Sequence, residues 1–465
     1  MERRTFLTAL LAGPALLAVL EACGSESSTG NTTVGNTTVG NTSVGNTSTA
    51  NTSTSDTSPA GATAGVARSN KPRATTQHAD DAQAGTVVDD FGVDMYRRLA
   101  AAKPAPVNLV FSPASIAIAL SMTRAGANGA TATEMDTVLH VGDPAGLAHS
   151  MNALTSELAT RSKSVPIPGA AASEVQLSIA NSLWAQKDLT FKAAFLDLLA
   201  SEYGAELNLV DYKSNPEAAR VLINAWVDDA TKHRIPELLA KGVLTADARL
   251  TLVNAIYMKA PWQSSFTKAS TVPGPFTTSA GATVQASMMT QSEHFSYSQG
   301  NGWQSVELPY IGGDLSMVIV LPEAGTALAV AVAALTNMAV TSRSVQVNLT
   351  LPKFDIESST GLATVLAAMG MPTAFDTSTA DFSGMTTDEK LFIGAVIHQA
   401  NITVDEDGTE AAAATAVVMA TTSAAQPDQP VTFLVDRPFV FAIRDQATNA
   451  ILFLGHIGDP TQTRS

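Results

Sequence analysis

Few residues of this 465-residue chain have the types and spacing of a catalytic group. Ser265 and Lys268 form a Ser-x-x-Lys pattern, in which a lysine can activate a serine for attack on an acyl group. No Lys-Thr-Gly or Ser-Asp-Asn motif accompanies it, and the chain has neither a Gly-x-Ser-x-Gly elbow nor a phosphate-binding loop. An acyl-serine enzyme is therefore a weak hypothesis, which ranks below the two functions considered further on as the second alternative. No catalytic residue is assigned.

Ligands for a metal are equally sparse. The seven histidines are scattered without a His-x-x-x-His or His-x-Glu pair, and the chain has one cysteine, so we expect no metal and no other cofactor. The formal net charge of −15 argues against a phosphate-binding face and hence against nucleic acid as a partner. Hydrophobic residues make up 45% of the chain, which is enough for most of its length to form a core.

The most unusual pattern lies in residues 403–420, about 50 residues before the end of the chain. Three acids and Gly408 lead into Thr409, Glu410 and a run of alanines. As a strand, residues 409, 411, 413 and 415 would share one face with no bulky side chain. Such a segment could enter between two existing strands with little steric penalty, although its alanines also favour a helix. The residues from Met419 to Pro430 have the composition of an exposed, cleavable loop.

The elements that must position this stretch change in character along the chain. Helical spacing predicts helices at 89–101, 191–203 and 224–239, the last interrupted near Pro236, and Ser112 with Pro113 opens another. Strand patterns occur at 174–186, 249–258, 306–321, 345–354, 431–435, 439–444 and 451–454. Because helices dominate the first half and strands the second, without regular βαβ alternation, the pattern predicts an α+β fold.

These blocks together resemble the serpin family of serine-protease inhibitors. The family's hinge pattern of an acid, any residue, Gly, Thr, Glu and small residues is matched by Glu406, Gly408, Thr409, Glu410, Ala411, Ala412, Ala413 and Ala414. FSPASIAIALSM, LVNAIYMKAPWQSSF, LPKF, IHQANITV, FLVDRPFVFAI and ILFLGHIGDP resemble further family blocks in the family's order. The resemblance implies a serpin domain at 81–465, with helices packed around a large mixed main β-sheet plus two smaller sheets, and an exposed reactive loop.

The resemblance also implies a mechanism, that of a suicide-substrate inhibitor rather than an enzyme. A target protease would cleave the loop and form an acyl-enzyme, and the cut loop would insert into the main sheet before water releases the acyl group. Counting from Glu406 by the family's loop spacing places the reactive bond between Thr422 and Ser423, within a bracket from Met419 to Ala425. A non-inhibitory serpin that acts as a binding module is the first alternative, and the intact hinge argues against it.

The resemblance assigns two further groups of residues. Ser112, Ser115, Asn254 and His398 match the polar cluster by which the family controls opening of the main sheet. Trp262, Lys353 and Glu406 match the contacts that keep the top of that sheet closed. Since a generic Lys–Glu pair is only a weak surface bridge, this second assignment depends on the resemblance.

The composition of the loop restricts the target protease. No Lys or Arg occurs between Leu391 and Asp436, so a trypsin-like protease lacks the basic residue that its pocket acid needs. Thr, Ala and Met suit an elastase-like or subtilisin-like serine protease, and a cysteine protease is a further candidate. Residues 149–164 hold only Arg161 and Lys163 as strong cations, so no glycosaminoglycan partner is expected. We expect a monomer.

The first 80 residues have the composition of a targeting segment and a tether. Residues 1–23 contain paired Arg3 and Arg4, then a short apolar run, and end at Cys23, which resembles a twin-arginine export signal with a lipobox. An ordinary signal with an incidental cysteine is the other interpretation. Residues 24–80 are low-complexity, with GNTTV repeats, and predict a flexible tether. The protein is thus expected to be bacterial and exported, either lipid-anchored to the cell envelope through Cys23 or extracellular.

Overall fold

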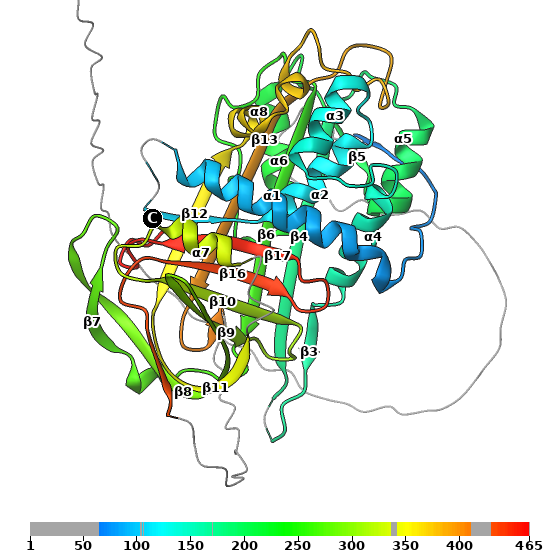
Figure 1. The fold of residues 1–465 in the computed structure, drawn as a ribbon. Helices are drawn as coiled ribbons and strands as arrows, with labels where there is room; N and C mark the ends of the chain where they lie inside the picture. The colour runs from blue at the N-terminus through cyan, green and yellow to red at the C-terminus, as the bar shows by residue number, and fades with distance from the viewer. Residues whose placement is uncertain are drawn as a thin grey trace, which may run out of the picture. The chain divides into compact units, whose positions relative to one another are not determined.

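The helices come mainly from the first half of the chain and pack on two large sheets (Figure 1). The computed structural model describes residues 65–102, 105, 107–169, 171–335, 342–410 and 429–464, which lie within one compact unit. Among these residues no helix is long and apolar enough to cross a membrane.

The α-helices are α1 (Ala82–Ala100), α2 (Pro113–Arg124), α3 (Gly129–Val138), α4 (Leu147–Ala159), α5 (Ala193–Leu198), α6 (Pro216–Ala230), α7 (Leu328–Ala334) and α8 (Ala363–Met369). Shorter helical turns are η1 (His78–Asp81), the π-helical η2 (Leu199–Tyr203), η3 (Lys268–Ser270) and η5 (Pro372–Phe375). Helix α2 is buried along nearly its whole length. It begins where the Ser112 hydroxyl accepts a hydrogen bond from the Ser115 N–H and Pro113 occupies the first turn.

The main sheet has the strand order β1-β5-β4-β6-β14-β13-β12, with β3 beside β4. Its strands are β1 (Gly65–Ala67), β3 (Lys163–Val165), β4 (Ser173–Gln186), β5 (Leu207–Val210), β6 (Leu250–Pro261), β12 (Phe354–Gly361), β13 (Ile393–Val404) and β14 (Gly408–Thr409). The sheet is mixed because β4 with β5 and β6 with β13 run parallel, while the other pairs run antiparallel. Helix α2 packs against β4 and β6, and α6 packs on the same strands through a separate apolar cluster.

The second sheet has the order β15-β11-β8-β9-β10-β16-β17-β2, with β7 beside β8. Its strands are β2 (Asn108–Phe111), β7 (Val272–Thr277), β8 (Thr283–Gly300), β9 (Trp303–Pro309), β10 (Leu315–Pro322), β11 (Arg343–Pro352), β15 (Val431–Leu434), β16 (Phe439–Asp445) and β17 (Ile451–Ile457). The expected two smaller sheets are one continuous sheet here, because the long β8 pairs in turn with β7, β11 and β9. The α+β architecture around a large mixed sheet is confirmed.

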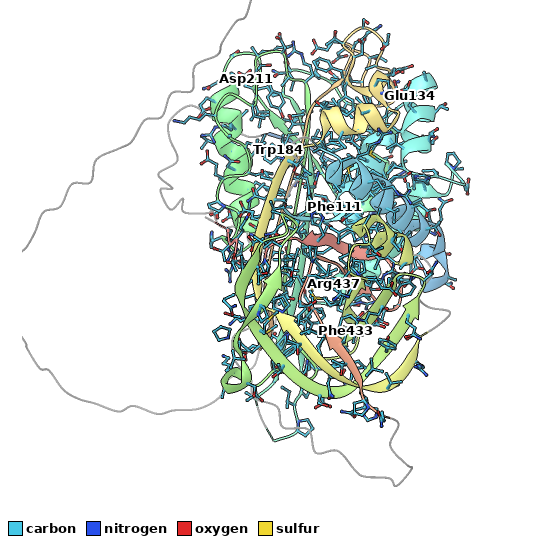
Figure 2. All side chains as sticks on the ribbon, turned by 60° about the vertical axis from the view of Figure 1, so that its left-hand side comes forward. Phe111, Glu134, Trp184, Asp211, Phe433 and Arg437 are labelled. Atoms are coloured by element: carbon cyan, nitrogen blue, oxygen red, sulfur yellow. The ribbon has the colours of Figure 1, made fainter. Side chains whose placement is uncertain are left out.

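Two apolar clusters hold these layers together. The larger lies between α1, α2 and the two sheets, and Figure 2 shows Phe111 in the middle of the packed side chains and Phe433 among the strands of the second sheet. The smaller cluster packs α6 and the segment after it against the main sheet. Within this cluster the rings of Trp184 and Trp226 contact edge to face, with 6.1 Å between their centroids. The central strand β6 is thus covered on both faces, which explains its almost continuous apolar sequence.

Two expectations about elements are wrong. The helix expected at 224–239 is α6 at Pro216–Ala230, because Asn215 accepts a hydrogen bond from the Ala218 N–H and Pro216 fills the first turn, signals that outweigh periodicity. The flexible tether expected up to residue 80 does not extend over residues 65–80, which form β1, an extended arm and η1. These residues are held by backbone pairing and polar side-chain contacts, which composition does not reveal.

Candidate functional site

The candidate site lies where β6 and β13 separate and the hinge enters between them. From Leu250 to Ile256, β6 pairs directly with β13. Beyond that point β14 occupies the gap, with Thr409 opposite Ala260 of β6 and opposite Val404 of β13. The first two hinge residues are therefore already a short central strand of the main sheet.

Gly408 is required by close approach of backbone. A Cβ at this position would lie 2.6 Å from the Cα of Pro261 and closer still to the carbonyl oxygen of Ala260. Its φ of +153° is also unfavourable for other residues. The glycine of the hinge pattern is thus explained by the contact of β14 with β6.

Thr409 fills a small buried site between the two strands. It is 1% exposed, and its hydroxyl lies 2.6 Å from the Tyr310 hydroxyl. Tyr310 in turn stacks on Trp262, with 4.6 Å between ring centroids and 10° between planes. Burial raises the pKa of Tyr310, so this phenol stays neutral. A larger or charged side chain at position 409 would have to displace this stack.

The turn before the hinge is held by hydrogen bonds from the segment that comes after β6. Trp262 donates its indole N–H to the carbonyl of Asp405 and its backbone N–H to that of Asp407, both at 2.9 Å. The Phe266 N–H donates to the carbonyl of Glu406, also at 2.9 Å. Three consecutive carbonyls of the turn are therefore bound, which anchors the start of the hinge at the top of the sheet.

Two lysines pair with the acids of the same turn. Lys353 Nζ lies 2.7 Å from Glu406 Oε2, and Lys268 Nζ lies 2.7 Å from Asp407 Oδ2. Burial alone would raise the pKa of Glu406, but hydrogen bonds from Lys353 and Thr271, the backbone and the charge of Lys353 together lower it. The bond to Asp407 raises the pKa of Lys268. Lys268 is thus a charged partner of the hinge turn rather than a base for Ser265, so the geometry speaks against an acyl-serine enzyme.

Glu410 ends the described part of the hinge and has partners that the sequence did not indicate. Its φ is +50°, and its side chain is only 3% exposed. Arg234, from the segment after α6, lies 3.2 Å from its carboxylate, and Arg464, near the C-terminus, lies 3.9 Å away. Burial raises the pKa of Glu410, and the two arginines oppose this shift. No local pattern could reveal contacts between residues so far apart in the chain.

A buried polar cluster lies lower down, under the β6–β13 seam. The Ser112 N–H donates to His398 Nε2 at 3.0 Å, and His398 Nδ1 lies 2.5 Å from Asn254 Oδ1. Because Nε2 accepts, the ring proton is on Nδ1 and is donated to Asn254. Burial lowers the pKa of His398 to about 3, so the ring is neutral. Ser115 joins the cluster by donating its hydroxyl to Asn181 at 2.8 Å, a residue that the sequence analysis missed.

One polar group in this cluster is left over. Asn254 Nδ2 is buried and has no hydrogen-bond partner among the described residues. A buried donor without a partner costs free energy, so a hydrogen-bond acceptor placed beside the Asn254 amide would be favourable.

Several residues singled out in the sequence lie outside the described residues. They are Cys23 of the export segment, the alanines Ala411, Ala412, Ala413 and Ala414, and the expected reactive bond between Thr422 and Ser423.

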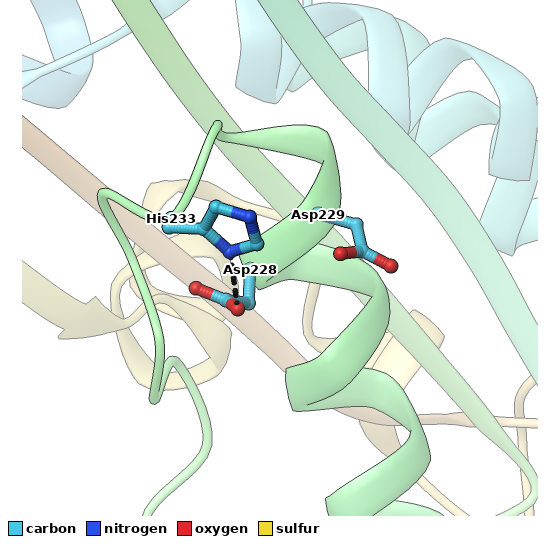
Figure 3. A group of neighbouring side chains, drawn as sticks. All are labelled: Asp228, Asp229 and His233. Carbon is cyan, nitrogen blue, oxygen red and sulfur yellow. Dashed lines mark hydrogen bonds and ion pairs between the residues drawn. The ribbon is translucent and has the colours of Figure 1, made fainter. Parts of the chain in front are cut away.

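One group of possible metal ligands appears that the sequence did not suggest. Asp228, Asp229 and His233 lie at the end of α6 with ligand atoms within 4.8 Å of one another (Figure 3). His233 Nδ1 is 2.7 Å from Asp228 Oδ2, and this hydrogen bond raises the pKa of His233. The group is largely exposed, and an ion pair of His233 with Asp228 accounts for its geometry.

Comparison with known proteins agrees with this arrangement. A family model described as serpin (serine protease inhibitor) matches residues 86–460. The protein Iris of Ixodes ricinus is 38% identical over 79% of this chain and 97% of its own length, and leukocyte elastase inhibitor A of Rattus norvegicus is 36% identical over 80% and 97%. The crystal structure of the thermophilic serpin tengpin in its native state aligns with a TM-score of 0.71 at 26% identity, over 84% of this chain and 97% of tengpin. Both the sequence matches and the fold thus identify a protein of the protease-inhibitor class rather than an enzyme, and the chain belongs to the serpin family.

Proposed function

We propose that this protein inhibits proteases as a suicide substrate, by inserting its cleaved reactive loop into the main sheet while the protease is still bound as an acyl-enzyme. The observation that carries this proposal is β14. Gly408 and Thr409 already pair with β6, and Thr409 also pairs with β13, in the position that a new central strand would continue.

The register of β14 predicts where the rest of the loop would lie after insertion. Thr409 is opposite Ala260 and Val404, and each further residue moves one step down both neighbouring strands. Residue 415 is six steps on, so it would lie opposite Asn254 and His398. Alternate residues share a face, so Thr415 would point, like Thr409, into the buried side of the sheet. Its hydroxyl could accept the hydrogen bond that Asn254 Nδ2 lacks.

Insertion is favourable because one ladder of hydrogen bonds is replaced by two. The direct β6–β13 pairs would be lost, and a strand running to the level of Leu250 would pair on both sides. A net gain of about ten hydrogen bonds, each about 1 kcal/mol, is on the order of 10 kcal/mol. The intact protein is then a kinetically trapped state, and cleavage of the loop removes the restraint that keeps the strand out.

The target we propose is an elastase-like or subtilisin-like serine protease. The segment from Leu391 to Asp436 has no Lys or Arg, and the bond expected to be cleaved, Thr422–Ser423, has small side chains. The rat relative named leukocyte elastase inhibitor A is consistent with such a target. From the N-terminal sequence we also propose export from a bacterial cell and, at Cys23, a lipid anchor, with the protein acting as a monomer.

The test is to mix the full chain with an elastase-like, a subtilisin-like, a chymotrypsin-like and a trypsin-like protease. With the elastase-like or the subtilisin-like protease we expect a complex that survives denaturing electrophoresis. A C-terminal peptide should also be released, and its mass should show that it begins at Ser423. Cleavage within the loop by every active protease without any such complex would contradict the proposal. In that case the protein would be a non-inhibitory serpin, and a role as a binding module would replace inhibition.

A further inference from the structure

A hairpin formed by β3 and the start of β4 projects beyond the main sheet. Strand β3 pairs with the first three residues of β4, and β4 pairs with β6 only from Gln176 onward. Gln176 lies opposite Lys259, and Thr409 of the hinge lies opposite the next residue of β6. We call residues 163–175 the β3–β4 hairpin. It begins at the level where the hinge enters the sheet, and Figure 1 shows it at the end of the molecule opposite to α3 and α8.

The base of the hairpin is held by buried polar contacts. Arg161, two residues after α4, forms an ion pair with Asp445 of β16, and its Nε lies 2.5 Å from Oδ1. Both side chains are almost fully buried. The Ser162 hydroxyl accepts a hydrogen bond from the Leu177 N–H at 2.9 Å and donates one to the Leu177 carbonyl at 3.0 Å. The hairpin therefore leaves the body of the protein in a fixed direction.

One side of the hairpin packs on the turn between β9 and β10. Lys163 forms an ion pair with Asp314 in this turn. A Cβ at Gly312 would lie 3.2 Å from Cγ2 of Val165 and 3.4 Å from Cε of Lys163, so the glycine allows the two segments to approach closely. The same turn begins at Tyr310, whose hydroxyl contacts the hinge. The hairpin is thus supported by the turn that also contacts the hinge.

The tip of the hairpin is apolar but exposed. Residues 165–172 read VPIPGAAA, eight residues in succession without a polar side chain. Pro166, Pro168 and the alanines at 171 and 172 are exposed, and a Cβ at Gly169 would meet no atom within 4 Å. The two prolines fix φ at their positions, which stiffens the run. A rigid, exposed apolar run is unfavourable in water and is typical of a surface that another protein covers.

The position of the hairpin indicates which protein this would be. The reactive loop starts at the hinge, one strand away from β4 in the sheet order. A protease of about 250 residues has a radius of gyration of about 18 Å, so a protease bound to the loop also covers surface beside the loop. The β3–β4 hairpin lies at the same end of the main sheet, and it is rigid before any partner binds, which reduces the cost of binding.

We propose that the β3–β4 hairpin is a docking element for the target protease, which contacts the apolar tip while the reactive loop occupies its active site. This inference rests on the proposed function, because the partner is the protease that cleaves the loop. The hairpin contributes to the choice of target. It favours a protease whose surface beside the substrate cleft is apolar over one whose surface there is charged, because a charge would lose its hydration against the tip.

The test is the full chain with Pro168→Glu, which places a charge in the tip. The matched control is Pro144→Glu, because Pro144 is also exposed but lies before α4, whose 13 residues separate it by about 20 Å from the hairpin. We measure the second-order rate of covalent complex formation with the elastase-like and the subtilisin-like protease. With the protease that the parent traps faster, Pro168→Glu should lower this rate about tenfold, and Pro144→Glu should stay within twofold of the parent.

Three further readouts separate docking from loop insertion and from net charge. The number of inhibitor molecules consumed per trapped protease should not change in Pro168→Glu, because the hairpin is not part of the inserted strand. Pro168→Ala leaves the tip uncharged and should stay within twofold of the parent. The loss in Pro168→Glu should persist at about 1 M salt, since it comes from an apolar contact and not from long-range repulsion.

Binding of an inactive protease, whose active-site serine is replaced by alanine, tests docking without the covalent step. Its dissociation constant should rise about tenfold for Pro168→Glu alone. Equal rates and equal dissociation constants for the parent and both glutamate variants would overturn the docking proposal and leave the proposed function intact. Binding that depends on the hairpin, without a covalent complex for any active protease, would overturn the proposed function and retain the docking element. If the parent bound neither inactive protease, both proposals would be contradicted.

Discussion

Thr409→Arg tests the hinge more directly than any other single change. Thr409 is 1% exposed, flanked by Ala260 and Val404, with its hydroxyl 2.6 Å from that of Tyr310. An arginine there would bury a positive charge beside the neutral phenol of Tyr310, and it would have to displace the Tyr310–Trp262 stack. We take the cost as about 3 kcal/mol, the lower end of the range for an uncompensated buried charge.

That cost acts on the step that competes with release of the protease. Each 1.36 kcal/mol is a factor of ten, so insertion should slow by about 150-fold. Hydrolysis of the acyl-enzyme happens in the protease and is unchanged, so most molecules should be cleaved without trapping. The assay titrates a fixed amount of protease with increasing inhibitor, reads residual activity, and checks for a covalent complex on denaturing gels.

Thr409→Ser is the matched control, because it keeps the hydroxyl beside Tyr310 and adds no volume. We expect the parent and Thr409→Ser to inhibit at close to one molecule per protease, and Thr409→Arg to need on the order of a hundred. If Thr409→Arg gave as much stable complex as the parent, the hinge assignment and the role of β14 would both be refuted.

Three other changes probe the same region. Trp262→Phe keeps the stacking on Tyr310 but loses the hydrogen bond to the carbonyl of Asp405. The free energy of unfolding of the intact form, measured in urea, should fall by about 1 kcal/mol, and the protein should convert faster to the inserted form. An unchanged urea midpoint would contradict this. Gly408→Ala should expel the hinge from the sheet, seen as faster hydrogen exchange at Ala260 and Val404, whereas Gly281→Ala, in open space and also at positive φ, should leave both sites unchanged. Burial lowers the pKa of His398 from 6.5 to about 3, so between these pH values only the unfolded state binds the proton. The free energy of unfolding should therefore be about 2 kcal/mol lower at pH 5 than well above pH 6.5. His398→Gln, which cannot titrate, should lack this part of the pH dependence.

The seam between β6 and β13 illustrates how far local pattern reaches. The apolar run at 249–258 predicts a buried strand, and β6 spans Leu250–Pro261. The alternation at 345–354 and the three C-terminal strands also match the structure closely. Such strands are predictable because their side chains face a core on one or both sides, and that environment imposes a regular apolar pattern. The start of α6 was misplaced because its capping residues, Asn215 and Pro216, outweigh the apolar periodicity of the residues after them.

The sequence by itself determined the family, the α+β class, the hinge with its glycine and small residues, and the absence of a basic residue in the reactive loop. Each is a property of residue type and order along the chain. The tertiary structure decided that two hinge residues already lie in the sheet, that Glu410 pairs with Arg234 and Arg464, and that residues 65–73 contact both β5 and α4. These contacts join residues that are far apart in the chain, and they depend on the order of the strands in the sheet. The partners come together only when the chain folds, so no local sequence pattern could predict these contacts.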